Sequence, residues 1–491
     1  METSTDDCGQ LALASSSRAK NRLKRKKLKA KDNFSCHKMH HLWIVWTFGT
    51  LTLQVCCTGT EYDGGNILEI TPESEKQVQC LQNILQSWLL DLLKPLQPED
   101  INVKTTVHVR IPSTALQLVK EDLLHCSQSL EILTGNVKYI EEDKIDTKET
   151  RKTINEYNYT TYHPMNEIYD WINGIAKKHS QFVTQHLLGL TYESRPMQYL
   201  KISQPSENHK KIVWIDCGIH AREWIAPAFC QWFVKEQIVQ NYQNDQRIRK
   251  ILQNLDIYVL PVLNIDGYIY SWTKERLWRK NRSQYGNGTC YGVDLNRNFN
   301  VSWCTHRSST NCSSNSFCGS SPVSEPETRA VVEFVESRKA DIVCFLTMHS
   351  YSQLILTAYG YSTGLSRNYN EIFKVAEMAA SAMEKIHGTK YRAGPFSKLL
   401  YEASGTSQDW VHDLGIDFSF TFELRDNGSH KFTLPEDQIQ PTCEETMAGV
   451  MTIIEYVNEK YFPNKASTTV FNCWINILIF NTFMQVSVLF F

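Results

Sequence analysis

Blocks of apolar residues alternate with polar segments over residues 153–460, a pattern that predicts strands and helices in succession. Short apolar runs at 212–215 and 342–348 are typical of buried strands. Longer segments at 224–234 and 325–337 have the length of helices, and the first of them is apolar enough to be buried. The alternation predicts an α/β domain with a mixed sheet. Its length exceeds the usual size of a domain but is plausible for a single one.

A second, smaller pattern occupies residues 61–150. Its predicted strands lie at 67–70, 104–111 and 138–140, and its predicted helices lie at 73–93 and 113–126. This β-α-β-α-β order predicts a small α/β sandwich.

A charged linker, residues 141–152, separates the two patterns. Its Lys and Arg residues make it an easy target for trypsin-like cleavage. A small domain, a cleavable linker and a larger domain together predict a zymogen. The expected boundaries are 1–59 for a leader, 60–152 for an activation-like domain with its linker, 153–462 for the larger domain and 463–491 for a tail.

The leader begins with a basic segment, residues 1–38, which on its own could be a nuclear signal or an RNA-binding tail. Met39 then opens a stretch that includes an apolar run, 42–57, and ends in small and polar residues. This is the layout of a signal peptide whose start is Met39, and the run is short for a membrane span. We expect cleavage near residues 57–60 and entry into the secretory pathway, with a signal anchor as the alternative. The net charge of −2 argues against a nucleic-acid partner.

The tail carries an apolar, uncharged run at 470–491, just after small residues at 466–469. This pattern is typical of a signal that is removed when a glycosylphosphatidylinositol (GPI) anchor is attached, although the polar spacer is short. The alternative is a membrane span without a cytoplasmic flank. We therefore expect an extracellular protein that a lipid attaches to the cell surface.

The chain has 15 cysteines, and four of them lie close together in a loop-rich stretch: Cys290, Cys304, Cys312 and Cys318. Such a cluster indicates zinc in a cytosolic protein and two disulfides in a secreted one. The stretch has no CxxC pair, which favours disulfides. The sequence leaves their pairing open.

Three other cysteines, Cys217, Cys230 and Cys344, lie in apolar runs and are predicted to be buried thiols. The chain also has six Asn-x-Ser/Thr sequons after residue 60, which fits a secreted glycoprotein. These sequons begin at Asn158, Asn281, Asn287, Asn300, Asn311 and Asn427.

Candidate metal ligands follow two of the apolar strands. His220 and Glu223 lie just past the strand at 212–215, where open α/β sheets place ligands, although alone they could equally form an ordinary ion pair in a turn. His349 follows the strand at 342–348 and could alone be structural. Together the three residues form a His₂Glu set, the arrangement of catalytic zinc that keeps one position open for water.

Other polar residues could complete a hydrolytic site. Glu423 lies in an alternating aromatic strand, where it either pairs with Arg425 or takes a proton from an attacking water beside zinc.

Arg279 and Arg297, which follows Asn296, could each alone be a surface charge. Beside zinc, the two arginines could bind a substrate carboxylate and stabilise an oxyanion. Tyr401 begins a flexible loop and could close over a ligand.

Five segments carry a family resemblance: GIHAREW at 218–224, LNRN at 295–298, MHSY at 348–351, TFELRD at 421–426 and the stretch 401–410. Taken in order, they resemble the zinc metallocarboxypeptidase family of pancreatic carboxypeptidases A and B. Other stretches, such as ISQPS and PVSEPET, resemble the carboxypeptidase O branch. The resemblance implies a mixed eight-stranded sheet flanked by helices, an activation domain before it, and one zinc ion per catalytic domain.

The resemblance also implies a role for each candidate residue and the release of the C-terminal amino acid from peptides and proteins by a monomer. By this resemblance His220, Glu223 and His349 bind zinc, Glu423 activates the water, and Arg279 stabilises the oxyanion. Asn296, Arg297 and Tyr401 hold the terminal carboxylate of the substrate, and Arg222 lines the next subsite.

Alignment of Tyr401 and Glu423 with the family places Gln408 at the bottom of the pocket for the terminal side chain. In the family, aliphatic residues there accept apolar side chains, an acidic residue accepts Lys or Arg, and arginine in the carboxypeptidase O branch accepts acidic side chains. A neutral amide cannot compensate a buried substrate charge, which argues against strong acidic selectivity. We expect a preference for polar or acidic side chains.

Two other functions compete with this interpretation. One is a catalytically inactive relative that serves as a binding module, which the complete zinc set and Glu423 disfavour. The other is a related zinc amidohydrolase such as a deacylase, which would not need a grip on a terminal carboxylate.

Overall fold

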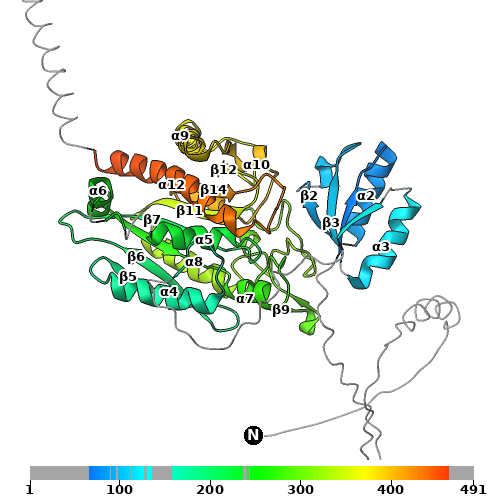
Figure 1. Cartoon of the computed structure of the whole chain (residues 1–491), viewed down its shortest axis with the longest axis horizontal. Coiled ribbons are helices and arrows are strands. Elements are labelled where there is room, and N and C mark those ends of the chain that lie inside the picture. Colours follow the sequence, from blue (N-terminus) through cyan, green and yellow to red (C-terminus); the bar gives the residue numbers. More distant parts are fainter. Residues whose placement is uncertain are drawn as a thin grey trace, which may run out of the picture. The chain divides into compact units, whose positions relative to one another are not determined.

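The computed structural model describes residues 66–463, apart from gaps at 89, 96–97, 112, 127–129, 135–156, 236–239 and 243 (Figure 1). The predicted signal peptide, the strand at 138–140, the charged linker and the apolar tail lie outside the described residues. Among the described residues, no helix combines the length and apolar character needed to cross a bilayer.

The N-terminal part of the described chain forms a four-stranded antiparallel sheet in the order β2-β3-β1-β4 with two helices. The elements in chain order are β1 (Asn66–Ile70), α2 (Glu75–Ser87), β2 (Asp91–Lys94), β3 (Val107–Ile111), α3 (Ser113–His125) and β4 (Leu130–Thr134). This β-α-β-β-α-β order confirms the small α/β sandwich. Its core packs strand residues such as Leu68 and Val109 against Leu81 of α2 and Leu123 of α3.

The helix predicted over 73–93 is too long. It ends at Ser87, and residues 91–94 pair with β3 as strand β2. The apolar residues after Ser87 continue a helix-like pattern, but pairing with a strand distant in sequence overrides that local signal. The Cys80–Cys126 disulfide joins α2 to the residue that follows α3.

The larger part of the chain is built on an eight-stranded sheet in the order β13-β12-β14-β11-β7-β8-β6-β5. The strands are β5 (Val183–Leu190), β6 (Pro196–Ile202), β7 (Lys211–Cys217), β8 (Leu255–Leu260), β11 (Ile342–Ser350), β12 (Leu354–Thr357), β13 (Arg392–Pro395) and β14 (Phe418–Leu424). The sheet is mixed: β14, β11, β7 and β8 run parallel, whereas β5, β6 and β12 each have antiparallel neighbours. The predicted mixed sheet is confirmed.

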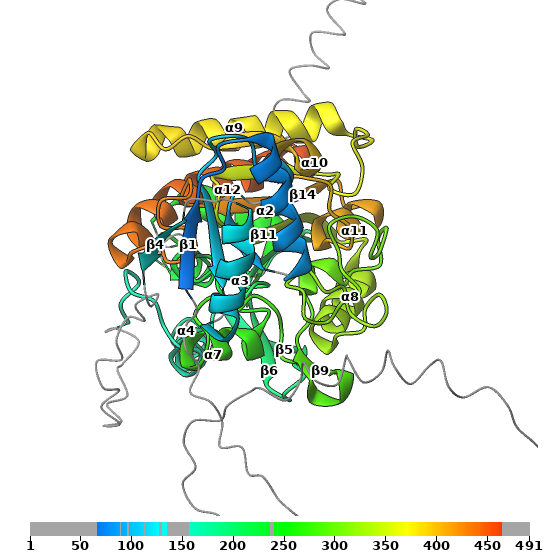
Figure 2. The ribbon, with the colours of Figure 1, turned by 90° about the vertical axis from the view of Figure 1, so that its right-hand side faces the viewer.

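Helices cover both faces of this sheet (Figures 1 and 2). The main helices are α4 (Met165–Lys178), α5 (Ile225–Trp232), α6 (Gln246–Asn254), α7 (Ile265–Thr273), α8 (Pro326–Arg338), α9 (Tyr369–His387), α11 (Ser407–Asp413) and α12 (Ile439–Tyr461). Coverage on both faces explains why every residue of β8 and β11 is buried and why these strands read as continuous apolar runs.

The order β14-β11-β7 decides where a site can form. Because these three strands are parallel neighbours, their carboxyl ends meet at one edge of the sheet. The register pairs His349 of β11 with Glu423 of β14, and the turn after β7 begins beside them at Gly218.

Candidate active site

The three predicted metal ligands converge at the carboxyl ends of β7 and β11. The Nδ1 atom of His220 lies 2.8 Å from Oε1 of Glu223, and Nδ1 of His349 lies 3.2 Å from Oε2 of the same carboxylate. The two Nδ1 atoms are 3.1 Å apart. One ligand atom from each of these buried residues lies within 4.8 Å of the others.

The turn that holds His220 and Glu223 depends on Gly218. This glycine has a φ of +69°, and a Cβ there would lie 3.0 Å from Cγ of Pro227. The backbone N–H of Ala221 donates to the carbonyl of Arg279 at 3.0 Å, which ties the turn to the segment that carries Arg279. The conformation of Gly218 before His220 and the hydrogen bond of Ala221 after it therefore fix the backbone that carries His220 and Glu223.

Hydrogen bonding on the far side of His220 shows that this donor set suits zinc. Its Nε2 lies 3.1 Å from Oδ1 of Asp294, and a carboxylate oxygen there requires that Nε2 carry the proton. Nδ1 then presents a lone pair toward Nδ1 of His349 and the Glu223 carboxylate. Burial, followed by the positive charge of Arg279, lowers the pKa of His220, which favours this neutral form. Two imidazole nitrogens and a carboxylate that face one another fit a zinc ion.

Asp294 is held as an anion despite burial. Burial opposes ionisation of Asp294, yet Arg279 and then His220 hold its pKa well below the ordinary value.

Sequence reasoning missed Asp294. Its Oδ1 also accepts from the backbone N–H of Asn296 at 3.0 Å, and its Oδ2 accepts from Nη2 of Arg279 at 2.8 Å. Its place directly before the LNRN motif was the available signal, but its contact with His220 spans 74 positions and depends on the fold. Arg279 is therefore paired with the buried Asp294, with its own side chain 14% exposed, and is not an isolated surface charge.

Cys217 and Cys230 form a disulfide, so the prediction of buried thiols is wrong for both. The end of β7 and the helix α5 bring their Cα atoms to 6.3 Å, a proximity that apolar surroundings alone do not reveal. Cys344 is free and buried, as predicted. The prediction of two disulfides among the four clustered cysteines is confirmed, with the pairs Cys290–Cys312 and Cys304–Cys318.

Glu423 is the penultimate residue of β14, is paired with His349 of β11, and lines the same cavity as the metal ligands. Its alternative interpretation, an ion pair with Arg425, is wrong, because Arg425 donates from Nε to Oε1 of Glu445 at 2.7 Å. Burial, and then the negative charge of Glu223, raise the pKa of Glu423 well above its ordinary range. A carboxyl group with this affinity for protons, beside a metal set, can act as a general base.

Asn296, Arg297 and Tyr401 line that cavity as well. Arg297 is 3% exposed, so it is not a surface residue; its Nη2 donates to the hydroxyl of Tyr401 at 3.4 Å. Oδ1 of Asn296 accepts from the backbone N–H of Ser407 at 2.9 Å, which leaves its Nδ2 as the donor for a ligand. An amide donor, a guanidinium and a phenol thus meet in one place.

Arg222 lines the cavity with its guanidinium 3.9 Å from the centre of the Phe432 ring.

Gln408 differs from the other candidates, because it is 1% exposed and is not among the described residues that line this cavity. Its Nε2 donates to the carbonyl of Leu356 at 3.2 Å, and its Oε1 accepts from Thr421 Oγ1 at 2.6 Å. Gln408 therefore lies outside the described lining of this cavity, and its predicted place at the bottom of the side-chain pocket stays a prediction.

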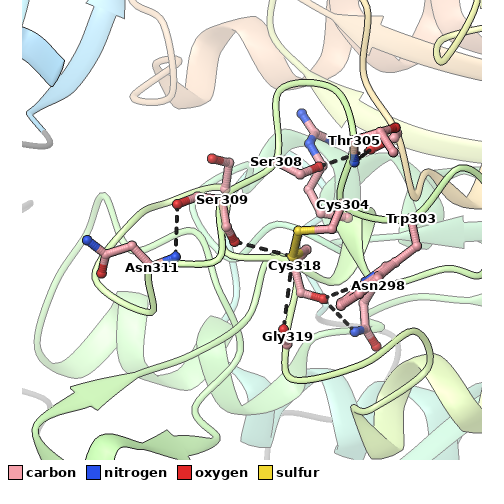
Figure 3. Close-up of a disulfide and its surroundings, with 12 residues drawn as sticks. Asn298, Trp303, Cys304, Thr305, Ser308, Ser309, Asn311, Cys318 and Gly319 are labelled. Carbon is pink, nitrogen blue, oxygen red and sulfur yellow. Dashed lines mark hydrogen bonds between the residues drawn. A yellow bond between two sulfur atoms is a disulfide. The ribbon is translucent and has the colours of Figure 1, made fainter.

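A disulfide-bonded loop adds Arg307 to the cavity. Figure 3 shows the Cys304–Cys318 disulfide of this loop, where the Cys318 carbonyl accepts from Nδ2 of Asn298 at 2.8 Å and from Nε1 of Trp303 at 3.0 Å. The Arg307 carbonyl accepts from Nε of Arg297 at 3.0 Å. Sequence reasoning missed Arg307, because nothing in a loop rich in Ser and Asn singles it out.

Comparisons with known proteins agree with this geometry. The profile of the family described as zinc carboxypeptidase matches residues 168–449, and that of the carboxypeptidase activation peptide matches residues 68–142. The chain is 62% identical to carboxypeptidase O of Bos taurus over 309 residues, 63% of this chain and 82% of that protein. It is 41% identical to carboxypeptidase B of Rattus norvegicus over 401 residues, 82% of this chain and 95% of that protein.

A solved structure extends the similarity to both parts of the described chain. The crystal structure of thrombin activatable fibrinolysis inhibitor superposes with a TM-score of 0.73 at 39% identity and covers 81% of this chain and 99% of that one. The fold, the His220–Glu223–His349 zinc site and the sequence matches lead to one conclusion. The chain belongs to the zinc carboxypeptidase family and is a metallocarboxypeptidase, which removes C-terminal residues.

Proposed function

We propose that the chain grips the free C-terminal carboxylate of a peptide through Arg297, Asn296 and Tyr401. The observation that carries this proposal is the burial of Arg297 in the cavity of the zinc ligands, next to the Tyr401 hydroxyl and the Asn296 amide. A guanidinium can hold a carboxylate through two parallel hydrogen bonds. The grip positions the last peptide bond at the zinc site.

His220, Glu223 and His349 would hold the zinc ion. When bound, zinc supplies positive charge that polarises the peptide carbonyl and makes water a stronger nucleophile. Glu423 takes a proton from the attacking water and passes it to the departing amine, which its raised pKa supports.

Arg279 would stabilise the charge that develops on the carbonyl oxygen. Its Nε and Nη2 both donate to Asp294, at 3.0 and 2.8 Å, whereas Nη1 lies on the side of the ligand set, 3.7 Å from Glu223 Oε1. The ion pair with Asp294 holds the guanidinium in place before substrate binds, so little reorganisation accompanies the reaction. Arg222, stacked on Phe432, would line the subsite for the preceding residue.

For the terminal side chain we propose a preference for polar or acidic groups. Gln408 already uses one amide N–H on Leu356 and its carbonyl on Thr421, so a terminal side chain that reached it would meet a neutral, polar group and no compensating charge. Arg307 adds positive charge to the cavity, which disfavours Lys and Arg in a substrate. Release of Glu, Gln, Phe and Lys from otherwise identical peptides tests this. We expect Glu or Gln to be released fastest, and fastest release of Lys would contradict the preference.

We further propose that residues 60–152 are an activation domain whose linker is cut near Arg151, and that residues 153–462 form the catalytic domain. The match of residues 68–142 to the activation peptide supports this division. Limited trypsin treatment should raise activity severalfold, and unchanged activity after complete cleavage would contradict a zymogen.

The disulfides and the activation peptide indicate the secretory pathway. We propose that the signal peptide and a GPI anchor place the enzyme at the cell surface as a monomer, since one chain supplies every residue of the site. Release from cells by a phosphatidylinositol-specific phospholipase tests the anchor, and retention would contradict it.

A further inference from the structure

We propose that Thr347 and Asp216 are positioning residues that form a hydrogen-bonded relay behind His349 and raise the affinity of the site for zinc. The proposal rests on the role of His349 as a zinc ligand. It concerns residues that do not contact substrate.

The relay runs between two neighbouring strands beneath the site. Oγ1 of Thr347 lies 3.3 Å from Nε2 of His349 and donates to Oδ1 of Asp216 at 2.7 Å. Nε1 of Trp214 donates to the other carboxylate oxygen, Oδ2, at 2.8 Å. All four side chains are buried, with exposed fractions of 1% or less.

Strand register explains why these groups meet. Thr347 of β11 is paired with Asp216 of β7, so their side chains leave the sheet on the same face. His349 lies two residues after Thr347 on β11 and therefore projects to that face too. The sheet itself aligns imidazole, hydroxyl and carboxylate in a row.

The direction of each hydrogen bond follows from what the groups can donate. The hydroxyl of Thr347 has one hydrogen, which goes to the Asp216 carboxylate. The hydroxyl can then only accept from His349, so Nε2 carries the proton and Nδ1 keeps its lone pair. Nδ1 is the atom that faces His220 and Glu223. The relay thus selects the tautomer that a metal ligand requires.

The two histidines of the site adopt the same tautomer, with the proton on Nε2, through different hydrogen-bond partners. His220 donates directly to the carboxylate of Asp294, whereas His349 reaches the carboxylate of Asp216 through the Thr347 hydroxyl. Ordered partners of this kind typically change metal affinity 10- to 100-fold.

The test compares zinc binding by the full chain and its variants in competition with a chelator of known affinity. Thr347→Val keeps the shape of the side chain and removes the hydroxyl, whereas Thr347→Ser keeps the hydroxyl. Thr357→Val is a matched control, because the buried Thr357 hydroxyl of β12 has no hydrogen-bond partner among the described residues. We expect Thr347→Val and Asp216→Asn each to weaken zinc binding about 10-fold or more. The double variant should be little worse than either, and Thr347→Ser and Thr357→Val should bind like the wild type.

A second readout separates positioning from a structural role. The melting temperature of each protein is measured with and without zinc. If the relay acts on the metal, Thr347→Val mainly reduces the gain in melting temperature that zinc confers. Zinc affinity within twofold of the wild type, or an equal loss of melting temperature in both forms, would overturn the proposal. His349→Ala separates a failure of the relay from a failure of the metal site, because unchanged zinc binding in that variant would refute the metal site itself.

Discussion

His220 and Asp294 are joined by a hydrogen bond of 3.1 Å between Nε2 and Oδ1, although 74 positions separate them in the sequence. The same carboxylate binds Arg279. One buried anion therefore orients a zinc ligand and the guanidinium proposed to face the developing oxyanion.

We predict that Asp294→Asn weakens zinc binding about 10- to 100-fold and lowers kcat/KM, because a neutral amide holds the imidazole N–H and the guanidinium less strongly. Chelator competition and steady-state kinetics measure the two effects. Asp266→Asn is the matched control. The buried Asp266 also pairs with an arginine, since its Oδ1 lies 2.6 Å from Nη1 of Arg195, but it is not one of the residues around the zinc ligands. That control should lose stability and retain zinc affinity. Equal zinc affinity in wild type and Asp294→Asn would contradict the orienting role.

Glu423→Gln should retain zinc and lose activity. Glu423 is absent from the three-residue metal cluster but lines its cavity, so an amide there removes the base and leaves the ligands in place. General-base catalysis typically contributes 10²- to 10⁴-fold, and we expect kcat to fall by about that factor. Metal analysis and peptide hydrolysis on the same sample provide the measurement. Activity within a few-fold of the wild type would exclude Glu423 as the base.

Removal of the Cys217–Cys230 disulfide should destabilise the protein around the zinc ligands. The two cysteines are 13 positions apart and bracket His220 and Glu223. Closure of a loop of this length is worth about 3 kcal/mol in the free energy of unfolding. Urea denaturation of the double variant Cys217→Ala/Cys230→Ala should show that loss, together with faster zinc release. Cys344→Ala, at a buried free thiol, is the control and should not change zinc release. An unchanged denaturation midpoint in the double variant would refute the prediction.

The buried carboxyl of Glu327 should make the free energy of unfolding depend on pH. The Oε1 atom of this buried carboxyl accepts from the backbone N–H of Tyr192 at 3.0 Å, and Oε2 accepts from Nδ2 of Asn281 at 3.1 Å. Burial nevertheless raises the pKa of Glu327 to about 7. Between pH 4.5 and 7 the folded state keeps a proton that the unfolded state has lost, so the contribution of Glu327 to the free energy of unfolding falls as the pH rises.

The fall is on the order of 3 kcal/mol at about 1.4 kcal/mol per pH unit. Glu327→Gln cannot lose a proton, so its stability relative to the wild type should rise between pH 5 and 7.5. Urea denaturation of both proteins at the two pH values measures the difference. A difference that is the same at both pH values would show that the Glu327 carboxyl is not protonated in this range.

The sequence predicted the parts of this enzyme that depend on local pattern. His220, Glu223, His349 and Glu423 each follow or end an apolar strand, and such positions point to the carboxyl edge of a sheet. The apolar runs likewise predicted the buried parallel strands.

What the sequence did not reveal depends on segments that only the fold brings together. The Asp294–His220 bond and the Cys217–Cys230 disulfide require knowledge of which strands are neighbours. Strand β2 was predicted as helix because its pairing partner β3 lies elsewhere in the chain. Asn281 carries a sequon, yet its amide is buried against Glu325, which excludes glycosylation of the folded protein there.

The proposed recognition of a free C-terminal carboxylate is tested most directly with two peptides that differ only at the C-terminus. One peptide has a free carboxylate and the other a carboxamide, and hydrolysis of each is measured before and after limited trypsin treatment. Arg297, Asn296 and Tyr401 are proposed to bind the terminal carboxylate beside the zinc ligands. We predict release of the last residue from the free peptide alone, loss of that activity when a chelator removes zinc, and recovery when zinc is restored. Equal release from the carboxamide peptide, or cleavage at internal bonds, would contradict the account.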